Sequence, residues 1–278
     1  MAERISMDVP AFWENGWQIL RGVYTPEEVQ KFRDAAQASR GVSGELLSRP
    51  LMRHAILDGK MVEVARQLLG SDDIMYAGDS SFTINSGQHG YHKDNADRKD
   101  ANAPDWQGRY TILRFGIYLQ DHTRHTGGLN LRHKSHNEPD LTTGKTIYVK
   151  TRPGDLAVWS LRTTHSGNGK LLSFPWWVTP EPQSQDKEGW PRYYREAKPD
   201  GDRIAVFVAL GLDDAHHDRY TTYLKTRKYM VDMWHRSKLD PEVFDEAAKI
   251  GLKIRDMHDE VAEDPDAGQN VEWKAIPY

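Results

Sequence analysis

The chain has 278 residues, of which 38% are hydrophobic and 28% charged, and its formal net charge is −4. A chain of this length and aromatic content buries a sizeable core, which excludes general disorder. The slightly acidic balance provides no basic field for a nucleic-acid backbone. There is no cysteine, which excludes disulfides, zinc fingers and iron–sulfur clusters. Any metal must therefore be bound by histidine, carboxylate or carbonyl groups.

Neither a secretory signal nor a membrane span is indicated. Residues 1–17 lack the apolar segment of a signal peptide. The longest strongly apolar stretch, residues 204–212, is far shorter than the roughly 18 residues that suggest a membrane span. We expect a cytoplasmic protein with no membrane or nucleic-acid partner, and the sequence leaves its oligomeric state open.

The N-terminal part is predicted to be mainly helical. Residues 17–22 resemble a short strand that ends in a turn. A helix should begin at Thr25, which can act as its cap, because a proline follows in the first turn and Glu28 completes a capping box. Residues 51–69 predict two short helices, with Gly70 as the stop.

From about residue 73 the pattern changes to short β-rich runs separated by Gly, Asn, Asp or Pro. The runs cover residues 73–76, 81–85, 110–119, 129–131, 146–149, 156–159 and 203–210. Many short strands with long connections favour an antiparallel sandwich or jelly roll. We therefore predict a mainly β fold with flanking helices at both ends of the chain.

One connection, residues 169–202, is long, proline-rich and aromatic, and it includes Trp176 and Trp177. Connections of this length are usually functional or disordered, and the aromatic content favours an ordered lid that shapes or covers a pocket. After it, residues 220–234 and 240–256 each predict a helix.

The predicted organisation is a single domain over residues 1–278. Residues 1–72 form an N-terminal helical buttress, residues 73–212 form the jelly-roll core with the lid inserted at 169–202, and residues 213–278 form C-terminal helices.

Three residues are candidate metal ligands. His92 and Asp94 project to the same face of an extended segment, because side chains two positions apart do so. Taken alone, this pair is more typical of a surface histidine beside a solvated acid than of a metal site. His165 follows the run at residues 156–159, and a jelly roll can bring distant strand ends to one mouth. Two imidazoles and one carboxylate form the facial triad of non-haem iron(II) oxygenases.

Arg203 opens the most apolar strand. A buried guanidinium needs a partner, and a bidentate carboxylate is its natural one. That carboxylate belongs either to a ligand or to an acid of the protein.

These motifs, in this order, resemble the phytanoyl-CoA dioxygenase family. The series is H-x-D at His92, residues 127–136, P-G-D at 153–155, residues 165–168, and Arg203 before an apolar strand, preceded by a similar N-terminal segment at residues 12–28. The resemblance covers roughly residues 10–212. One feature departs from the family pattern, because His165 and Arg203 are separated by 38 positions (203 − 165) with residues 169–202 inserted between them.

The resemblance implies a double-stranded β-helix with Fe(II) at its mouth, held by His92, Asp94 and His165. It also implies dioxygen and 2-oxoglutarate as cosubstrates, with Arg203 gripping the distal carboxylate of 2-oxoglutarate. Arg192 and Arg195 are alternatives to Arg203, although neither opens a strand.

The resemblance bears on the reaction as well. The expected reaction is oxidation of an unactivated C–H bond, by hydroxylation or oxidative cyclisation, and Asp94 argues against halogenation. The family pattern also implies that His136 is structural.

Further contacts are predicted more loosely. Cosubstrate candidates are Thr83, Asn85 and Ser166, and substrate candidates are Lys93, Arg114, Tyr118, Arg132, Trp176 and Trp177. Arg114 would alternatively be an exposed sheet charge, and the two tryptophans would alternatively pin the lid. The polar character of these residues favours a polar small-molecule substrate of specialised metabolism, such as a sugar-bearing natural product, an amino-acid derivative or a phosphonate.

Two rival functions use the same three ligands. One is a zinc- or manganese-dependent hydrolase, which would need a general base near the metal-bound water. The other is a non-catalytic module that binds a metal or a small molecule on the same barrel.

Overall fold

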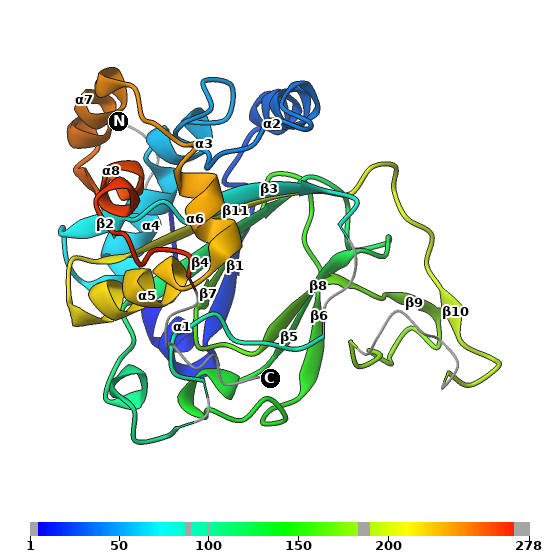
Figure 1. The fold of residues 1–278 in the computed structure, drawn as a ribbon. Helices are drawn as coiled ribbons and strands as arrows, with labels where there is room; N and C mark the ends of the chain where they lie inside the picture. The colour runs from blue at the N-terminus through cyan, green and yellow to red at the C-terminus, as the bar shows by residue number, and fades with distance from the viewer. Residues whose placement is uncertain (1–4, 87–89, 99, 183–189, 270–278) are drawn as a thin grey trace.

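The computed structural model describes residues 5–86, 90–98, 100–182 and 190–269 (Figure 1). The helices are α1 (Val9–Asn15), α2 (Pro26–Ala38), α3 (His54–Leu57), α4 (Lys60–Leu69), α5 (Ala215–Lys225), α6 (Lys228–Trp234), α7 (Pro241–Lys249) and α8 (Met257–Ala262). The strands are β1 (Trp17–Leu20), β2 (Ile74–Tyr76), β3 (Ser80–Ile84), β4 (Ile112–Tyr118), β5 (Gly128–Arg132), β6 (Thr146–Val149), β7 (Leu156–Ser160), β8 (His165–Gly169), β9 (Leu172–Phe174), β10 (Arg195–Glu196), β11 (Ile204–Leu212) and β12 (Leu252–Ile254). Within these described ranges, no helix is both long and apolar enough to cross a bilayer.

Two sheets form the body of the molecule. The larger sheet has the order β1-β7-β4-β11-β2-β12, and β3 pairs with the first half of β11. The smaller sheet has the order β6-β5-β8. Buried side chains from both sheets share one cluster, with Tyr118 and Trp159 on the larger sheet against Leu129 and Leu131 on the smaller one. The predicted jelly-roll sandwich, mainly β with flanking helices, is confirmed.

The larger sheet separates two environments. On β4, Leu113, Phe115 and Ile117 belong to the main hydrophobic core, which the sheet shares with α2 and α4. The alternate residues of the same strand, Arg114 and Tyr118, face the opposite way and line a cavity. This is the two-residue alternation of a strand that is buried on both faces. The helical layer thus supports one face of the sheet and leaves the other for a site (Figure 1).

Most predicted elements are present. The capping box at Thr25 and Glu28 starts α2, with Thr25 N donating to Glu28 Oε2 at 2.8 Å. The predicted helix over residues 240–256 is wrong in its second half. It ends at Lys249 because Gly251 has a φ of +65°, and the chain then adds β12 parallel to β2.

The inserted segment forms an arm. β9 and β10 pair antiparallel within it, and Figure 1 shows this pair beyond the smaller sheet, on the side away from α5 and α6. Residues 183–189, which belong to the predicted lid, lie outside the described residues.

His136 is a structural residue in this fold. It is 1% exposed, and its Nε2 donates to the carbonyl oxygen of Trp13 at 2.9 Å. Burial lowers the pKa of His136 to about 4, so the ring is neutral at neutral pH. Gly16 closes over the ring, because a Cβ at this position would lie 2.4 Å from Nδ1 of His136.

We expect Gly16→Ala to destabilise the protein by about 3 kcal/mol or more, because it adds a clash with His136 to the cost of a left-handed backbone at φ +82°. Gly22→Ala is the matched control, since its φ is +62° and nothing lies within 4 Å of the added Cβ. This control should lose only about 1–2 kcal/mol. Urea unfolding measures both, and equal losses would contradict a tight contact between Gly16 and His136.

Candidate metal centre

His92, Asp94 and His165 converge. One ligand atom from each lies within 4.8 Å of those of the other two. Nε2 of His92 is 3.7 Å from Oδ1 of Asp94, and Nε2 of His165 is 3.5 Å from Oδ2 of Asp94. The predicted meeting of these side chains is confirmed.

Backbone pairing brings these residues together. His92 and His165 form an antiparallel bridge, with N–H···O distances of 3.0 Å and 2.9 Å in the two directions. Asp94 N donates to the carbonyl oxygen of Leu161 at 3.0 Å, which continues the same pairing. Because the side chains of residues 92 and 94 lie on one face of this segment, both are directed toward His165.

The hydrogen bonds of the imidazoles orient them for coordination. Nδ1 of His92 lies 3.0 Å from the oxygen of Gly90, and Nδ1 of His165 lies 3.0 Å from the oxygen of Thr163. A proton on each Nδ1 satisfies these carbonyl groups and leaves the Nε2 lone pairs facing Asp94.

The charge states suit a metal as well. Burial, and to a smaller extent His92, lowers the pKa of His165 to about 3, which keeps the ring neutral. Burial alone would raise the pKa of Asp94, but His165, Arg114 and His92 together hold it well below its usual value. Two imidazoles and one carboxylate are a donor set that fits Fe(II) and leaves coordination positions open.

Arg114 holds Asp94 in place. Its Nη2 lies 3.1 Å from Oδ2 of Asp94, and its Nη1 lies 2.8 Å from Oδ2 of Asp79. The Tyr220 hydroxyl donates to Asp79 and accepts from Arg114. Arg114 lines the cavity and is not an exposed sheet charge. Two protein carboxylates occupy its guanidinium, so it orients Asp94, and the predicted substrate contact of Arg114 stays a prediction.

A cavity of about 380 Å³ connects the three ligands to Arg203. Its lining from the two sheets is Asp79, Ser80, Ser81, Thr83, Ser86, His92, Asp94, Arg114, Tyr118, Leu129, Trp159, His165, Gly167, Arg203 and Phe207. The α6 region adds Tyr229, Met230 and Met233, which sequence reasoning did not identify. Only their position on the predicted helix over residues 220–234 could have drawn attention to them.

Arg203 is a buried cation in the lining of this cavity. It is 7% exposed, and its Nη1 donates to Ser86 Oγ at 3.1 Å and to Thr83 Oγ1 at 3.3 Å. Its Nε donates to the carbonyl oxygen of Gly127 at 2.5 Å. Among the described residues, no carboxylate lies within 4.0 Å of the guanidinium. A salt bridge to an acid of the protein therefore has no support there, and the charge calls for an anionic ligand.

Tyr118 lies beside Arg203 in the lining. The guanidinium carbon of Arg203 is 6.0 Å from the Tyr118 ring centroid. The buried Tyr118 hydroxyl has no hydrogen-bond partner among the described residues. Burial raises its pKa above the usual value, so the hydroxyl is protonated and can donate to an anion held by Arg203.

Two of the predicted cosubstrate contacts lie outside the cavity lining. Asn85 supports the backbone of Arg203, since its Oδ1 accepts from Arg203 N at 2.8 Å and its Nδ2 donates to Asp202 at 2.6 Å. Ser166 is fully buried, and the cavity is lined instead by its neighbours His165 and Gly167. The strand alternation that directs His165 inward turns Ser166 away.

Four of the predicted substrate contacts also lie elsewhere. Lys93 is fully buried, with Nζ donating to the carbonyl oxygens of Ser135 at 2.8 Å and Arg162 at 2.7 Å. Arg132 pairs with Glu181 at 2.9 Å. Neither residue lines the cavity, which corrects both predictions.

Trp176 and Trp177 are 70% and 64% exposed on the arm. Their rings contact each other edge to face, with centroids 5.5 Å apart, and they are absent from the cavity lining. The tryptophans therefore lie away from the centre, and α6 covers the cavity in the place predicted for the lid.

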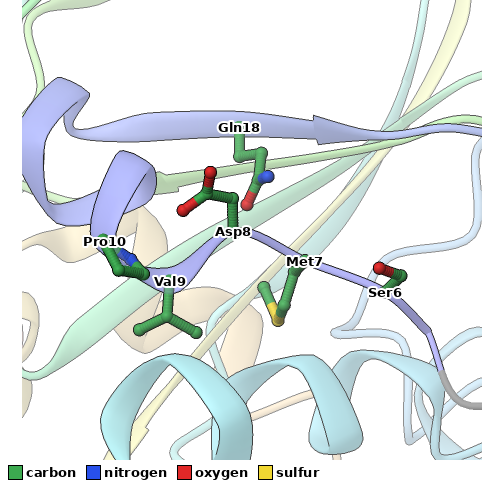
Figure 2. Close-up of a pocket in the computed structure, with 6 residues that line it drawn as sticks. All are labelled: Ser6, Met7, Asp8, Val9, Pro10 and Gln18. Carbon is green, nitrogen blue, oxygen red and sulfur yellow. The ribbon is translucent and has the colours of Figure 1, made fainter.

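Two other features lie apart from the centre. A shallow hollow at the N-terminal segment places Asp8 opposite Gln18, while Met7 and Val9 extend from the other side of the segment toward the main core (Figure 2). Asp8 is engaged as the cap of α1, accepting from Ala11 N at 2.9 Å. Asp256, His258 and Asp259 also place possible ligand atoms within 4.8 Å of one another, but Asp256 is engaged as the N-cap of α8.

Comparisons with known proteins show the fold. No family model matches the chain, and no curated protein matches it. Among solved structures, the non-heme alpha ketoglutarate-dependent epimerase SnoN from nogalamycin biosynthesis is 16% identical, with a TM-score of 0.52 over 73% of this chain and 81% of that chain. HygX from Streptomyces hygroscopicus, with nickel and 2-oxoglutarate bound, is 15% identical, with a TM-score of 0.52 over 73% and 85%. EctD from S. alaskensis, with 2-oxoglutarate and 5-hydroxyectoine, is 17% identical, with a TM-score of 0.51 over 73% and 74%. The chain shares the jelly-roll fold of these non-haem enzymes.

We expect His92→Ala and His165→Ala each to weaken Ni(II) binding by about 10–100-fold or more. Loss of a residue that merely hydrogen-bonds a metal ligand already costs this much, and these variants remove a ligand itself. His258→Ala is the matched control from the helix-cap group, and it should leave the affinity unchanged. Titration calorimetry on the metal-free protein measures all three. A loss in the His258 variant equal to that in the His165 variant would place the metal elsewhere.

Proposed function

We propose that this chain is an Fe(II)- and 2-oxoglutarate-dependent oxygenase that oxidises an unactivated C–H bond of a polar small molecule. One arrangement carries the proposal: the triad of His92, Asp94 and His165 shares a cavity with Arg203, a buried cation for which no described residue supplies a carboxylate. The fold is that of SnoN, HygX and EctD, whose structures are described with alpha ketoglutarate dependence or bound 2-oxoglutarate.

Different residues of the cavity would bind the metal and the cosubstrate. His92, Asp94 and His165 would hold the iron and leave three positions for other ligands. Arg203 would bind the distal carboxylate of 2-oxoglutarate, with Thr83, Ser86 and the Tyr118 hydroxyl beside it. When bound, iron with 2-oxoglutarate and dioxygen supplies the oxidising power, and succinate and carbon dioxide are released.

The protein itself would orient the reacting groups and exclude water from them. Leu129, Trp159 and Phe207 give the cavity an apolar wall, which keeps water from the reacting groups. Arg114 keeps the Asp94 carboxylate ionised and oriented. A carboxylate at this position occupies the place that a halide would need, so the site favours hydroxylation or oxidative cyclisation over halogenation.

A hydrolase is disfavoured by the absence of a suitable base. Apart from Asp94, the only carboxylate in the described lining is Asp79. Asp79 is already held by Arg114 and by the Tyr220 hydroxyl, so it is poorly placed to accept a proton from a metal-bound water.

We expect Arg203→Gln to weaken 2-oxoglutarate binding by about tenfold or more, because a charged hydrogen-bonding partner of the distal carboxylate is lost. The measurement is the visible charge-transfer band that forms when Fe(II) and 2-oxoglutarate are added anaerobically, and His92→Ala should abolish it.

Arg192→Gln is the matched control for Arg203→Gln. Arg192 is the alternative arginine of the inserted arm, and it is exposed. A wild-type protein without the band, or an Arg192 variant that loses as much affinity as the Arg203 variant, would count against the proposal.

The substrate class is proposed more broadly. We keep a sugar-bearing natural product, an amino-acid derivative or a phosphonate of specialised metabolism as candidates, since charged groups such as Arg203 stand beside the apolar wall of the cavity. Release of succinate above the substrate-free rate, across a panel of such metabolites, identifies the class that couples to turnover.

A further inference from the structure

A second hollow, of about 470 Å³, opens on the same metal ligands. It is lined by Gly90, Tyr91, His92, Asp94, Arg98, Arg227 and Tyr229. Three of these residues, His92, Asp94 and Tyr229, also line the cavity that leads to Arg203. The second hollow is therefore an outer approach to the centre, on the side away from the proposed cosubstrate site.

Two arginines from distant parts of the sequence meet in this hollow. Arg98 follows the ligand segment, whereas Arg227 lies between α5 and α6. Both guanidinium groups contact the hydroxyl of Tyr223. Both also lie over its ring, with guanidinium carbons 4.9 Å and 4.8 Å from the centroid. The fold thus brings two positive charges to one neutral side chain.

The charge of Arg227 has an electrostatic cost that an anion would remove. Like charges held close together repel each other, and partial burial strengthens the repulsion because water screens it less. Arg98 is 8% exposed. Nε of Arg227 is buried without a hydrogen-bond partner, and no carboxylate in the described parts of the chain lies within 4.0 Å of its guanidinium. The one carboxylate in the lining, Asp94, is engaged by Arg114 and the metal centre.

We propose that Arg98 and Arg227 bind an oxyanion of the substrate, a carboxylate or a phosphate, beside the metal centre. Two guanidinium groups offer the paired donors that such oxygens accept. That the anion belongs to the oxidised substrate rests on the proposed oxygenase function, whereas the anion site itself rests on the geometry of the hollow.

Tyr229 would contact the body of the same substrate. It is 65% exposed and lines both hollows, so it lies on the path between the arginines and the interior cavity. An aromatic ring at this place offers a face for the part of the molecule that links the anion to the oxidised carbon. The substrate class is thus narrowed to small acids whose reacting C–H bond lies a short distance from the charge.

The other cavity arginines do not compete for this role. Arg114 is held by Asp79 and Asp94, and Arg203 lies at the opposite end of the interior cavity. With 2-oxoglutarate bound at Arg203, an added anion is left with the outer arginines.

The test uses protein loaded with Ni(II) and saturated with 2-oxoglutarate, so that the proposed cosubstrate site is filled. Calorimetry with inorganic phosphate and with benzoate should show saturable binding of at least one of them. Arg227→Gln should weaken that binding about tenfold or more, because a charged hydrogen-bonding partner is lost. Arg236→Gln, an exposed arginine just after α6, is the matched control and should bind as the wild type does. Failure of both probes to bind, or equal affinity in the Arg227 and wild-type proteins, overturns the proposal.

A second variant tests the proposal if Arg227→Gln does not fold. If thermal unfolding shows that Arg227→Gln is not folded, Arg227→Lys replaces it. This variant keeps the charge but loses the paired donors, so the anion affinity should still fall, and an unchanged affinity overturns the proposal.

The substrate assignment has its own readout. In a succinate-release panel of carboxylic acids paired with their methyl esters, only the acids should stimulate turnover, and stimulation by esters alone overturns the assignment. If anions bind and Arg227→Gln removes this binding, but the charge-transfer band never forms, the oxygenase proposal fails while the anion site stands.

Discussion

The centre depends on one short backbone pairing. The two hydrogen bonds between His92 and His165 join a segment of irregular structure to the start of β8. Without that bridge, the two imidazoles would belong to parts of the chain that have no other reason to meet. Side chains along an extended segment point alternately to opposite faces, so this pairing directs residues 92 and 94 to the cavity and residue 93 away from it. The side chain of Lys93 therefore points away from the cavity, where its Nζ donates to two carbonyl groups.

Arginines provide the charge around this centre, and their partners distinguish their roles. Arg114 has two carboxylates and is part of the framework. Within the described parts of the chain, Arg203 contacts neutral oxygens and an aromatic ring, which is compatible with its proposed role in binding an anion. Arg98 and Arg227 contact one phenol between them. For Arg203 and Arg227, no carboxylate among the described residues lies within 4.0 Å, and a buried cation without such a partner is costly to fold unless a ligand supplies one.

The C-terminal helices complete the site from outside the barrel. α6 contributes Tyr229, Met230 and Met233 to the cavity, and α5 contributes Tyr220 to the network around Asp79. The inserted arm, in contrast, carries exposed tryptophans that are absent from the cavity lining. β8 and the irregular segment beside it thus carry His165, His92 and Asp94, whereas α6 supplies part of the surface on which the proposed substrate would lie.

Local sequence signals determined the elements that depend on local chemistry. The capping box at Thr25 needs only four neighbouring residues, and the alternation along β4 needs only one strand, so both could be read directly. Motif order also predicted that His92, Asp94 and His165 meet, as they do, and it drew attention to Arg203. β8 escaped detection, since Ser, Gly and Asn have little intrinsic preference for strands and its conformation comes from pairing with β5.

Tertiary structure alone decided which polar side chains reach the cavity. Ser166 and Lys93 are adjacent in sequence to ligands, yet each faces away, whereas Arg227 and Tyr229 come from a helix corner far along the chain. The sequence determined the chemistry of the metal ligands, because residue type and two-residue spacing suffice for it. The partners of each arginine and the cover of the cavity depend on how distant segments pack, and no local pattern encodes the distances between them.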